Sequence, residues 1–474
     1  MGDRNRQIVL INPWIYDFAA YDLWAKPLGL LYLGSIMRES GYEVRLIDCM
    51  DRHDPLLRAS TGCDPKVRKY GVGPYHRTPI PKPSVLRHVP RQYARYGITE
   101  EHFQAYLREG ERPDLVLITS MMTYWYPGVF RAIELVKGQW PSVPVILGGI
   151  YATLCYDHAR ERSGADEVVR GGEIQDILKV IEDVLGGRSQ VVPEHFRDFP
   201  TPAWDLYPKL SYTVILTGRG CPFRCTFCAS SLLFPRFERR DPVACVDEVV
   251  RLVRARRIQD IAFYDDALLI HPEQHILPLL DEVIGRRLNV RFHTPNGLHV
   301  REINRALTQK MWKAGFRTVR LSVESSDPER QRATGAKITN TDLQDAVEHL
   351  RTAGYRGKDL EAYVLMGLPG QTVDEVVASV LFVARCGIKT KLARFSPIPG
   401  TVEWDRASAQ GGLDPRDDPL LHNNSIYPLR SSDLTVEDME QVSLFVRLIN
   451  YGLDMGFNPM DDSRVSAVLR KRMA

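Results

Sequence analysis

The N-terminal third of the chain alternates short apolar runs with stretches in which apolar residues recur at helical spacing. The runs IVLI, VRLI, LVLI and VPVIL are almost continuously apolar, which is typical of strands buried on both faces of a parallel sheet. Leu28, Leu31 and Ile36 share one face of a predicted helix, and Gly41 follows as a stop signal. We predict strands at Gln7–Asn12, Tyr42–Asp48, Asp114–Thr119, Val143–Gly149 and Glu167–Arg170. The pattern therefore predicts a doubly wound, Rossmann-like α/β domain over residues 1–190, with ligands at the carboxyl ends of its strands.

A long insertion, at about residues 52–113, separates the second and third predicted strands. It is rich in Arg, Lys, Pro and Tyr, and it ends in a predicted short helix, Thr99–Arg108, with Thr99 as N-cap. An insertion of this length is usually functional or disordered, and stacked Arg and Tyr side chains can bind a polyanion. The basic residues are spread out rather than clustered, which favours a packing arm laid over the neighbouring domain.

A second series of strands and helices begins after a Pro-rich linker at residues 191–211. We predict strands at Thr213–Thr217, Asp260–Tyr264, Asn289–Thr294, Thr318–Val323, Asp359–Met366 and Lys391–Phe395. Helices are predicted between them, for example Pro242–Arg256 and Asn304–Ala314. Six repeats indicate a partial (β/α)6 TIM-like barrel over residues 212–400, with catalytic groups at the strand carboxyl ends. Residues 401–474 are predicted to form a mainly helical C-terminal extension that includes the amphipathic helix Leu434–Leu453.

Composition and charge narrow the function classes. The formal net charge is only +3 over 474 residues, so bulk charge does not indicate a nucleic acid or an anionic membrane as partner. The polar start MGDRNRQ does not resemble a signal peptide, and no apolar run is long enough to span a bilayer. We expect a cytoplasmic protein without membrane contact, in which closely spaced cysteines are metal ligands or catalytic thiols.

Three of the eight cysteines, Cys221, Cys225 and Cys228, lie in the loop GRGCPFRCTFCASS after the first predicted barrel strand. Thiolates are the usual ligands of iron–sulfur clusters, and three of them leave one iron open to a small molecule. A structural zinc site is the alternative, but such sites favour four closed ligands in paired C-x2-C units, and no second pair is present. The remaining cysteines are predicted to be small buried hydrophobes: Cys49, Cys63, Cys155, Cys245 and Cys386.

The spacing C-x3-C-x-aromatic-C, with Phe227 at the aromatic position, resembles the radical S-adenosylmethionine (SAM) superfamily. The resemblance covers about residues 210–399. It implies a [4Fe–4S] cluster on the three cysteines and reductive cleavage of SAM to methionine and a 5′-deoxyadenosyl radical. It also implies an electron donor such as flavodoxin or ferredoxin.

The same resemblance implies a set of SAM contacts at the ends of the barrel strands. Asp265, followed by Asp266, stands where the family often has a Gly-Gly-Glu stretch near the methionine amino group. Glu324 and Ser325 resemble the polar pair that meets the ribose and methionine portions, although an internal hydrogen-bond network is the alternative for such buried groups. The implied SAM-binding residues are Phe227, Asp265, Glu324, Ser325, Arg332, Gly367 and Pro397.

The first domain resembles the cobalamin-binding domain of B12-dependent radical SAM enzymes, through the segments SMMT, LGGIYAT and GADEVVRGGE. The residues implied to border cobalamin are Ser120, Met122, Thr123, Gly148, Gly149, Gly172 and Glu173. The Asp-x-His-x-x-Gly signature with its cobalt-binding His is absent, as it is from many radical SAM members. The alternative is a degenerate domain kept for packing or substrate binding.

The resemblance implies a cobalamin-dependent radical SAM enzyme that methylates an unactivated carbon of a small-molecule or peptide substrate. A second hypothesis is a radical SAM enzyme without cobalamin that carries out cyclisation, rearrangement or sulfur insertion. A third is a non-enzymatic iron–sulfur or nucleic-acid-binding protein that uses the basic insertion, although we expect no nucleic-acid partner.

Overall fold

The computed structural model describes residues 6–187, 191–429 and 431–457, and the chain divides into two compact units. The first unit comprises Met1–Val214, Leu232–Pro235 and Arg416–Ile426, and the second comprises Ile215–Ser231, Arg236–Pro415 and Tyr427–Ala474. Among the described residues, no helix has the length and apolar character needed to cross a membrane.

The first unit is built on a five-stranded parallel sheet with the order β10-β9-β8-β1-β4. Its strands are β1 Gln7–Asn12, β4 Glu43–Asp48, β8 Leu115–Ile118, β9 Val145–Leu147 and β10 Glu167–Val168. Its helices include α1 Leu28–Glu39, α4 Tyr126–Gln139, α5 Ile150–Leu154, α6 Tyr156–Arg162 and α7 Ile174–Leu185. The chain leaves β1 first toward β4 and later returns on the other side at β8, so the strand order reverses beside β1. This confirms the doubly wound domain, whose ligands are expected at the carboxyl ends beside β1 and β8.

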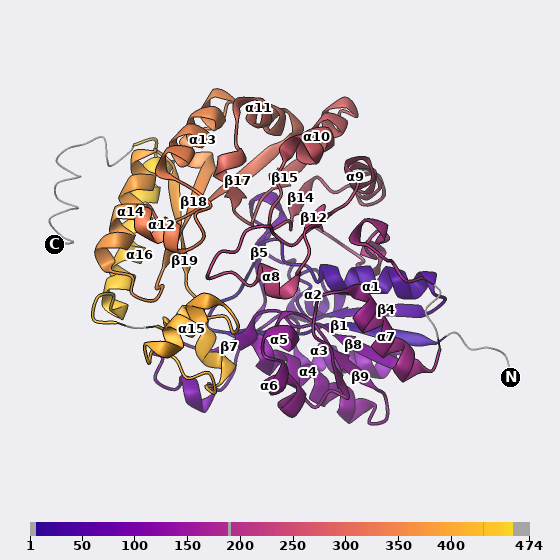
Figure 1. The fold of residues 1–474 in the computed structure, drawn as a ribbon. Helices are drawn as coiled ribbons and strands as arrows, with labels where there is room; N and C mark the ends of the chain where they lie inside the picture. The colour runs from indigo at the N-terminus through magenta and orange to yellow at the C-terminus, as the bar shows by residue number, and fades with distance from the viewer. Residues whose placement is uncertain (1–5, 188–190, 430, 458–474) are drawn as a thin grey trace. The chain divides into compact units, whose positions relative to one another are not determined.

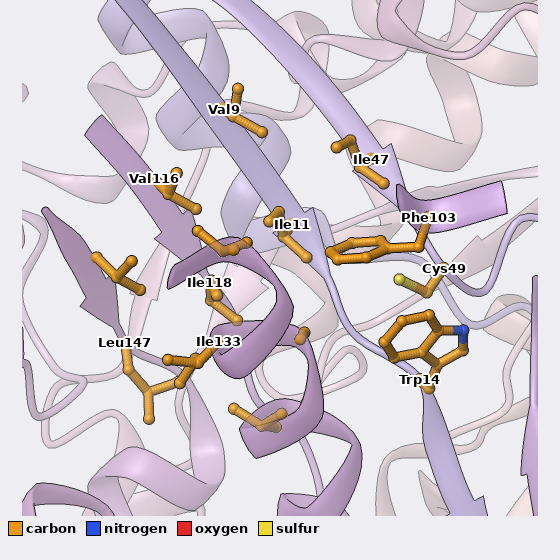
Figure 2. Close-up of a cluster of buried hydrophobic side chains, with 14 of the residues drawn as sticks. Val9, Ile11, Trp14, Ile47, Cys49, Phe103, Val116, Ile118, Ile133 and Leu147 are labelled. Atoms are coloured by element: carbon orange, nitrogen blue, oxygen red, sulfur yellow. The ribbon is translucent and has the colours of Figure 1, made fainter. Parts of the chain in front are cut away.

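The continuously apolar runs are explained by two cores, one on each face of this sheet. Val9 and Ile11 of β1 belong to the core that also holds Trp14 and Phe103, as Figure 2 shows. Ile8 and Leu10, the alternating residues of the same strand, belong to the core on the opposite face. Because successive side chains of a strand point to opposite faces, both sets must be apolar.

The insertion folds as part of the first unit. It contributes α2 Pro55–Thr61, β5 Gly73–Pro74, β6 Arg77–Pro79, β7 Ala94–Tyr96 and α3 Glu100–Glu109. Strand β7 pairs antiparallel with β6 and with β2 (Ile15–Asp17), which follows β1, and β5 pairs with β3 (Tyr21–Asp22). Thr99 caps α3 as predicted, since its side chain accepts a hydrogen bond from the His102 amide. A buried ion pair of 2.7 Å between Arg52 and Asp22 further ties the insertion to this unit.

The second unit contains the predicted partial barrel, with the strand order β11-β14-β15-β17-β18-β19 and parallel pairing. These strands are β11 Thr213–Ile215, β14 Asp260–Phe263, β15 Arg291–His293, β17 Phe316–Glu324, β18 Leu360–Met366 and β19 Lys389–Arg394. Shorter strands are β12 Gly218–Arg219, β13 Glu238–Arg239 and β16 Leu298–His299. The helices are α8 Ser230–Leu233, which crosses the unit boundary, and α9 Pro242–Arg256, α10 Ile276–Gly285, α11 Arg305–Ala314, α12 Pro328–Ala333, α13 Asn340–Thr352, α14 Val373–Arg385, α15 Val402–Ala409 and α16 Val436–Asp454.

Helices α14 and α16 lie beside β18 and β19 and cover their outer face (Figure 1). Met366 of β18 belongs to the same core as Val380 of α14 and Val442 of α16, and Leu392 of β19 packs against it. The opposite face of these strands therefore points into the barrel. That inner face, together with the loops at the strand carboxyl ends, holds the polar groups described below.

Candidate active site

The three-cysteine loop follows β11 and the short strand β12, at the carboxyl end of the first barrel strand. All three cysteines are free thiols; Cys221 and Cys225 are half-buried and Cys228 is exposed. The Cys228 amide donates to the Cys225 carbonyl at 3.0 Å, and the Ser230 amide donates to the Cys228 Sγ at 3.5 Å. Within the described ranges, no three His, Cys, Asp or Glu side chains converge as ligands of a single metal ion would.

Two other segments of the second unit hold this loop in place. Thr226, between the second and third cysteines, donates its hydroxyl to Glu403 of α15 at 2.6 Å and accepts the Glu403 amide at 3.1 Å. Gly335, which follows α12, has φ +123°, and a Cβ at this position would lie 3.2 Å from the Cys225 Cα. The segment after α12 thus packs directly against the backbone of the cysteine loop.

Lys337, two residues beyond Gly335, connects the loop to the end of β17. Its Nζ donates to the Glu324 Oε1 at 2.8 Å and lies 5.7 Å from the centre of the Phe227 ring. Burial raises the pKa of the Cys225 thiol, and the positive charge of Lys337 opposes that rise. Sequence reasoning missed Lys337, although its place in the run ERQRATGAK just after Arg332 was a usable signal.

Glu324 lies at the last position of β17 with φ +68°, a backbone conformation that a glutamate rarely adopts. The register between β17 and β18 shifts between Ser322 and Glu324, so the strand is bulged there. Strained positions of this kind cluster at functional sites because the surrounding structure must enforce them. The carboxylate is turned toward Lys337, beside the cysteine loop.

The carboxyl ends of β18 and β19 meet the same loop. Phe227 packs against Leu365, Leu368 and Phe395, so the aromatic residue before the third cysteine rests on these strand ends. Gly367 follows β18 with φ +100° and donates its amide to the Gln371 side chain at 2.8 Å. Pro397 is buried just beyond Phe395.

Asp265 lies at the carboxyl end of β14, fully buried, and supports the entry to the cysteine loop. Its carboxylate accepts the Thr217 amide at 3.0 Å and the Thr217 hydroxyl at 2.6 Å. Burial raises the pKa of Asp265 to about 6, although these hydrogen bonds lower it. The neighbouring Asp266 accepts a hydrogen bond from Ser230, two residues beyond Cys228.

Two of the residues expected to contact SAM differ from the rest: Ser325 is hydrogen-bonded within the protein, and Arg332 is exposed. The Ser325 hydroxyl donates to Glu375 at 3.1 Å and accepts the Asp327 amide at 3.1 Å, so the internal network that we considered as the alternative is present at this residue. Arg332 is exposed on α12. Arg330 on the same helix instead forms the ion pair with Glu375, at 2.9 Å.

In the first unit, the expected cobalamin residues gather at the carboxyl ends of β8 and β9. The Ser120 hydroxyl donates to the Gly148 carbonyl at 2.7 Å and accepts the Ala152 amide at 3.2 Å. Gly149 has φ +95°, and a Cβ there would lie 2.3 Å from the Ser120 carbonyl oxygen, so only glycine allows the two strand ends to approach this closely.

The neighbouring residues leave this end of the sheet accessible. A Cβ built on Gly148 or on Gly172 would meet no atom within 4 Å, and the Met122 side chain is 42% exposed. Thr123 is buried, and its hydroxyl lies 3.2 Å from His422 Nδ1. Glu173 precedes the first residue of α7. Open backbone beside two glycines fits a bulky ligand that approaches the strand ends closely.

Comparison with protein families matches two regions of the chain. The model described as the radical SAM superfamily matches residues 215–383, and the model described as the B12 binding domain matches residues 89–175. The chain therefore contains a radical SAM domain and a B12-binding domain.

Curated relatives and solved structures agree with this assignment. An uncharacterized methyltransferase of Pyrococcus horikoshii is 27% identical over 331 residues, covering 64% of this chain and 71% of the relative. Cytidylyl-2-hydroxyethylphosphonate methyltransferase of Streptomyces wedmorensis is 22% identical over 482 residues, covering 87% and 84%. The radical SAM methyltransferase TsrM of Kitasatospora setae, solved with cobalamin and a [4Fe–4S] cluster, shares the fold with a TM-score of 0.63 at 17% identity, covering 86% of this chain and 78% of TsrM.

The residues of this radical SAM protein fit the three cofactors that its domains imply: a [4Fe–4S] cluster, SAM and cobalamin. The three free thiols of one loop supply a cluster donor set that leaves one iron open, and Lys337 places a cation beside them. Gly148 at the end of β9, together with Gly172 after β10, provides the open backbone that a corrinoid requires.

Proposed function

We propose that this radical SAM enzyme transfers a methyl group to an unactivated carbon of a small-molecule or peptide substrate. The observation that carries the proposal is the presence of a three-cysteine barrel loop and a B12-binding domain in one chain. Two relatives named as methyltransferases support it, because this chain covers 71% and 84% of their lengths. The cyclisation chemistry named for other relatives is the second candidate, supported by a 25% identical anaerobic magnesium-protoporphyrin IX monomethyl ester cyclase of Rubrivivax gelatinosus, of which the chain covers 52%.

When bound, the cluster supplies an electron for the cleavage of SAM to a 5′-deoxyadenosyl radical, and cobalamin supplies the methyl group. In this proposal Cys221, Cys225 and Cys228 hold the cluster. Glu324, at the bulged end of β17, receives the polar portion of SAM, and Phe227 and Gly367 border its adenine. Ser120 and the pair Gly148–Gly149 border cobalamin.

The roles of the other residues are proposed from their positions in the fold. Asp265 positions the loop after β11 through Thr217, and Pro397 lies near the adenine side. The proposed neighbours of cobalamin also include Met122, Thr123, Gly172 and Glu173. The proposed neighbours of SAM also include Ser325 and Arg332. An electron donor such as flavodoxin or ferredoxin would reduce the cluster.

Anaerobic reconstitution with iron, sulfide and hydroxocobalamin tests the proposal. We expect visible spectra of both cofactors, and 5′-deoxyadenosine after addition of SAM and reductant. Cys225→Ala should abolish 5′-deoxyadenosine formation, whereas Cys63→Ala, which removes an exposed thiol elsewhere in the chain, should not change it. The expectation that all five remaining cysteines are buried is wrong for two of them: Cys63, just after the short helix α2, is exposed, and Cys386 is only partly buried. Unchanged cleavage by Cys225→Ala would refute the proposed cluster site.

A further inference from the structure

A group of charged side chains lies on the inner face of the barrel, between strands β17, β18 and β19. Arg320 of β17 pairs in register with Glu361 of β18, and Tyr363 of β18 pairs with Lys391 of β19. On β19, Leu392 packs against the α14–α16 core and Thr390 hydrogen-bonds to Asn450 of α16. Since side chains alternate along a strand, Lys391 points to the inner face.

This group extends toward the carboxyl ends of the strands, where the SAM residues lie. The Arg320 guanidinium donates to Glu361 at 2.9 Å and to the Tyr363 hydroxyl at 3.3 Å. The Tyr363 hydroxyl in turn donates to the carbonyl of Pro295, two residues beyond the end of β15, at 2.7 Å. Burial raises the pKa of the Tyr363 phenol, and the nearby carboxylates Glu361 and Glu324 add to the rise.

The charges of the group do not balance around Lys391. Its ammonium is near one cation, Arg320, and one carboxylate, Glu361, which Arg320 already engages. Across the part of the chain that the structure describes, no carboxylate forms an ion pair with Lys391, whereas Lys389 on the same strand pairs with Asp454 at 3.0 Å. Burial and the nearby Arg320 lower the pKa of Lys391 to about 8, so the side chain is still mostly protonated at neutral pH.

We propose that Lys391 and Arg320 bind an oxyanion group, a carboxylate or a phosphate, of the substrate inside the barrel, while Tyr363 holds the Arg320 guanidinium by accepting its hydrogen bond. This deepens the proposed function, on which it rests, by giving the substrate a negative charge. Lys391 is a partly buried cation whose one nearby carboxylate already pairs with Arg320, and such a charge is unfavourable unless a further anion joins it. An oxyanion would accept hydrogen bonds from both cations at once.

The same residues explain why this site would serve the substrate instead of SAM. Glu324, Lys337 and Phe227 gather at the cysteine loop, where the family cofactor is expected, and Lys337 already supplies a cation there. Lys391 lies on a different strand, β19, in register with Tyr363 of β18. The Arg320–Tyr363–Pro295 connection reaches from Lys391 toward the strand ends, so an anion held there would place the rest of a substrate near SAM.

Equilibrium dialysis of the reconstituted holoenzyme tests the inference without turnover, with SAM present and reductant absent. Radiolabelled orthophosphate and radiolabelled acetate are the probes, and comparison of the two identifies the preferred oxyanion. We expect saturable binding of at least one probe, weakened about tenfold or more by Lys391→Met and by Lys391→Gln, because each removes a charge-assisted hydrogen bond to the anion. Lys391→Arg should retain most of the affinity.

Lys310→Met is the matched control, since it removes a lysine that pairs with Asp281 on the helical exterior of the same unit. With SAM present throughout, absence of probe binding to the wild type or equal binding to Lys391→Met would each overturn the inference. Because no SAM is cleaved in this assay, its outcome is independent of 5′-deoxyadenosine formation. An enzyme that cleaves SAM but binds both probes equally without Lys391 would refute this inference and leave the proposed function standing.

Discussion

At the scale of single residues, Lys337 is the side chain on which the chemistry of the cysteine loop depends most directly. Only 11% of its side chain is exposed, yet Glu324 and the neighbouring thiols raise its pKa above the ordinary lysine value despite this burial, so the side chain is charged. One ammonium thus compensates the Glu324 carboxylate and favours the thiolate form of Cys225. A thiolate is the form that binds iron and reacts with electrophiles.

We predict that Lys337→Met slows alkylation of Cys225 in the cluster-free protein by several-fold at mildly alkaline pH. The thiol pKa is already raised by burial, and loss of the opposing cation raises it further, so a smaller fraction is thiolate. Mass spectrometry of iodoacetamide-labelled peptides measures the rate, with exposed Cys63 of the first unit as internal reference.

Lys337→Arg keeps the charge and should retain most of the Cys225 reactivity. If Lys337→Met leaves the ratio of Cys225 to Cys63 labelling unchanged, the ammonium does not act on the thiol. The same variant leaves the buried Glu324 carboxylate without its partner, which should lower the free energy of unfolding by about 3 kcal/mol.

At the scale of elements, the cysteine loop depends on the turn after α12 as much as on the strand that precedes it. Gly335 in that turn has φ +123° and lies against the Cys225 backbone, and the Thr226 amide donates to the Thr334 carbonyl at 3.4 Å. A side chain at residue 335 would have to displace backbone, because the nearest atom is a Cα and not the end of a flexible side chain.

We predict that Gly335→Ala reduces the iron and sulfide retained per chain to less than half of the wild-type amount, through displacement of Cys225. Gly370→Ala is the control: this glycine also has a positive φ, +66°, but its added Cβ would meet no atom within 4 Å. Both variants place a side chain at a positive φ, which costs about 1–2 kcal/mol in the left-handed region of Gly370 and more at the φ of Gly335, and only Gly335→Ala adds the contact with the Cys225 backbone. Equal cluster content in the two variants would show that the contact with Cys225 does not matter.

Much of this element-level arrangement could be predicted from local pattern. Helix α9 begins and ends where the sequence placed it, because Asp241 caps it, Pro242 occupies its first turn and the periodicity stops at Arg256. The cysteine loop could likewise be placed after a buried strand, because the β-rich run Thr213–Thr217 directly precedes it. The strand Glu167–Arg170 was predicted too long, since only Glu167 and Val168 pair with β9.

At the scale of the whole molecule, contacts between residues distant in sequence were not predictable. Nothing in the Arg416–Ile426 segment marks it as part of the first unit, because its partners become visible only when the chain has folded. Lys337, Glu324 and Cys225 likewise come together from separate segments of the second unit. Short-range pattern therefore identifies the donor residues, whereas their charge balance depends on the three-dimensional fold.

The Arg416–Ile426 segment supplies a hydrogen-bond donor to a buried carboxylate of the first unit. Asp17, at the end of β2, accepts hydrogen bonds from Trp125 Nε1 at 2.7 Å, from the Phe18 amide at 2.6 Å and from Asn423 Nδ2 at 2.8 Å. Burial raises the pKa of Asp17, and the donors oppose the rise. Asn423 thus joins a segment more than 400 residues away to the strand that follows β1.

We predict that Asn423→Ala lowers the free energy of unfolding of the first unit by about 2 kcal/mol, because it removes a donor from a buried carboxylate. The loss should be smaller at acidic than at neutral pH. The variant raises the folded-state pKa of Asp17 further above its unfolded value. A carboxyl group whose pKa is raised on folding lowers the free energy of unfolding as the pH rises. Hydrogen exchange measures this locally: amides of β2 and α4 should exchange faster, while those of β17 and β18 keep the wild-type rate. Uniformly faster exchange in both units would instead mean that the Arg416–Ile426 segment stabilises the chain as a whole.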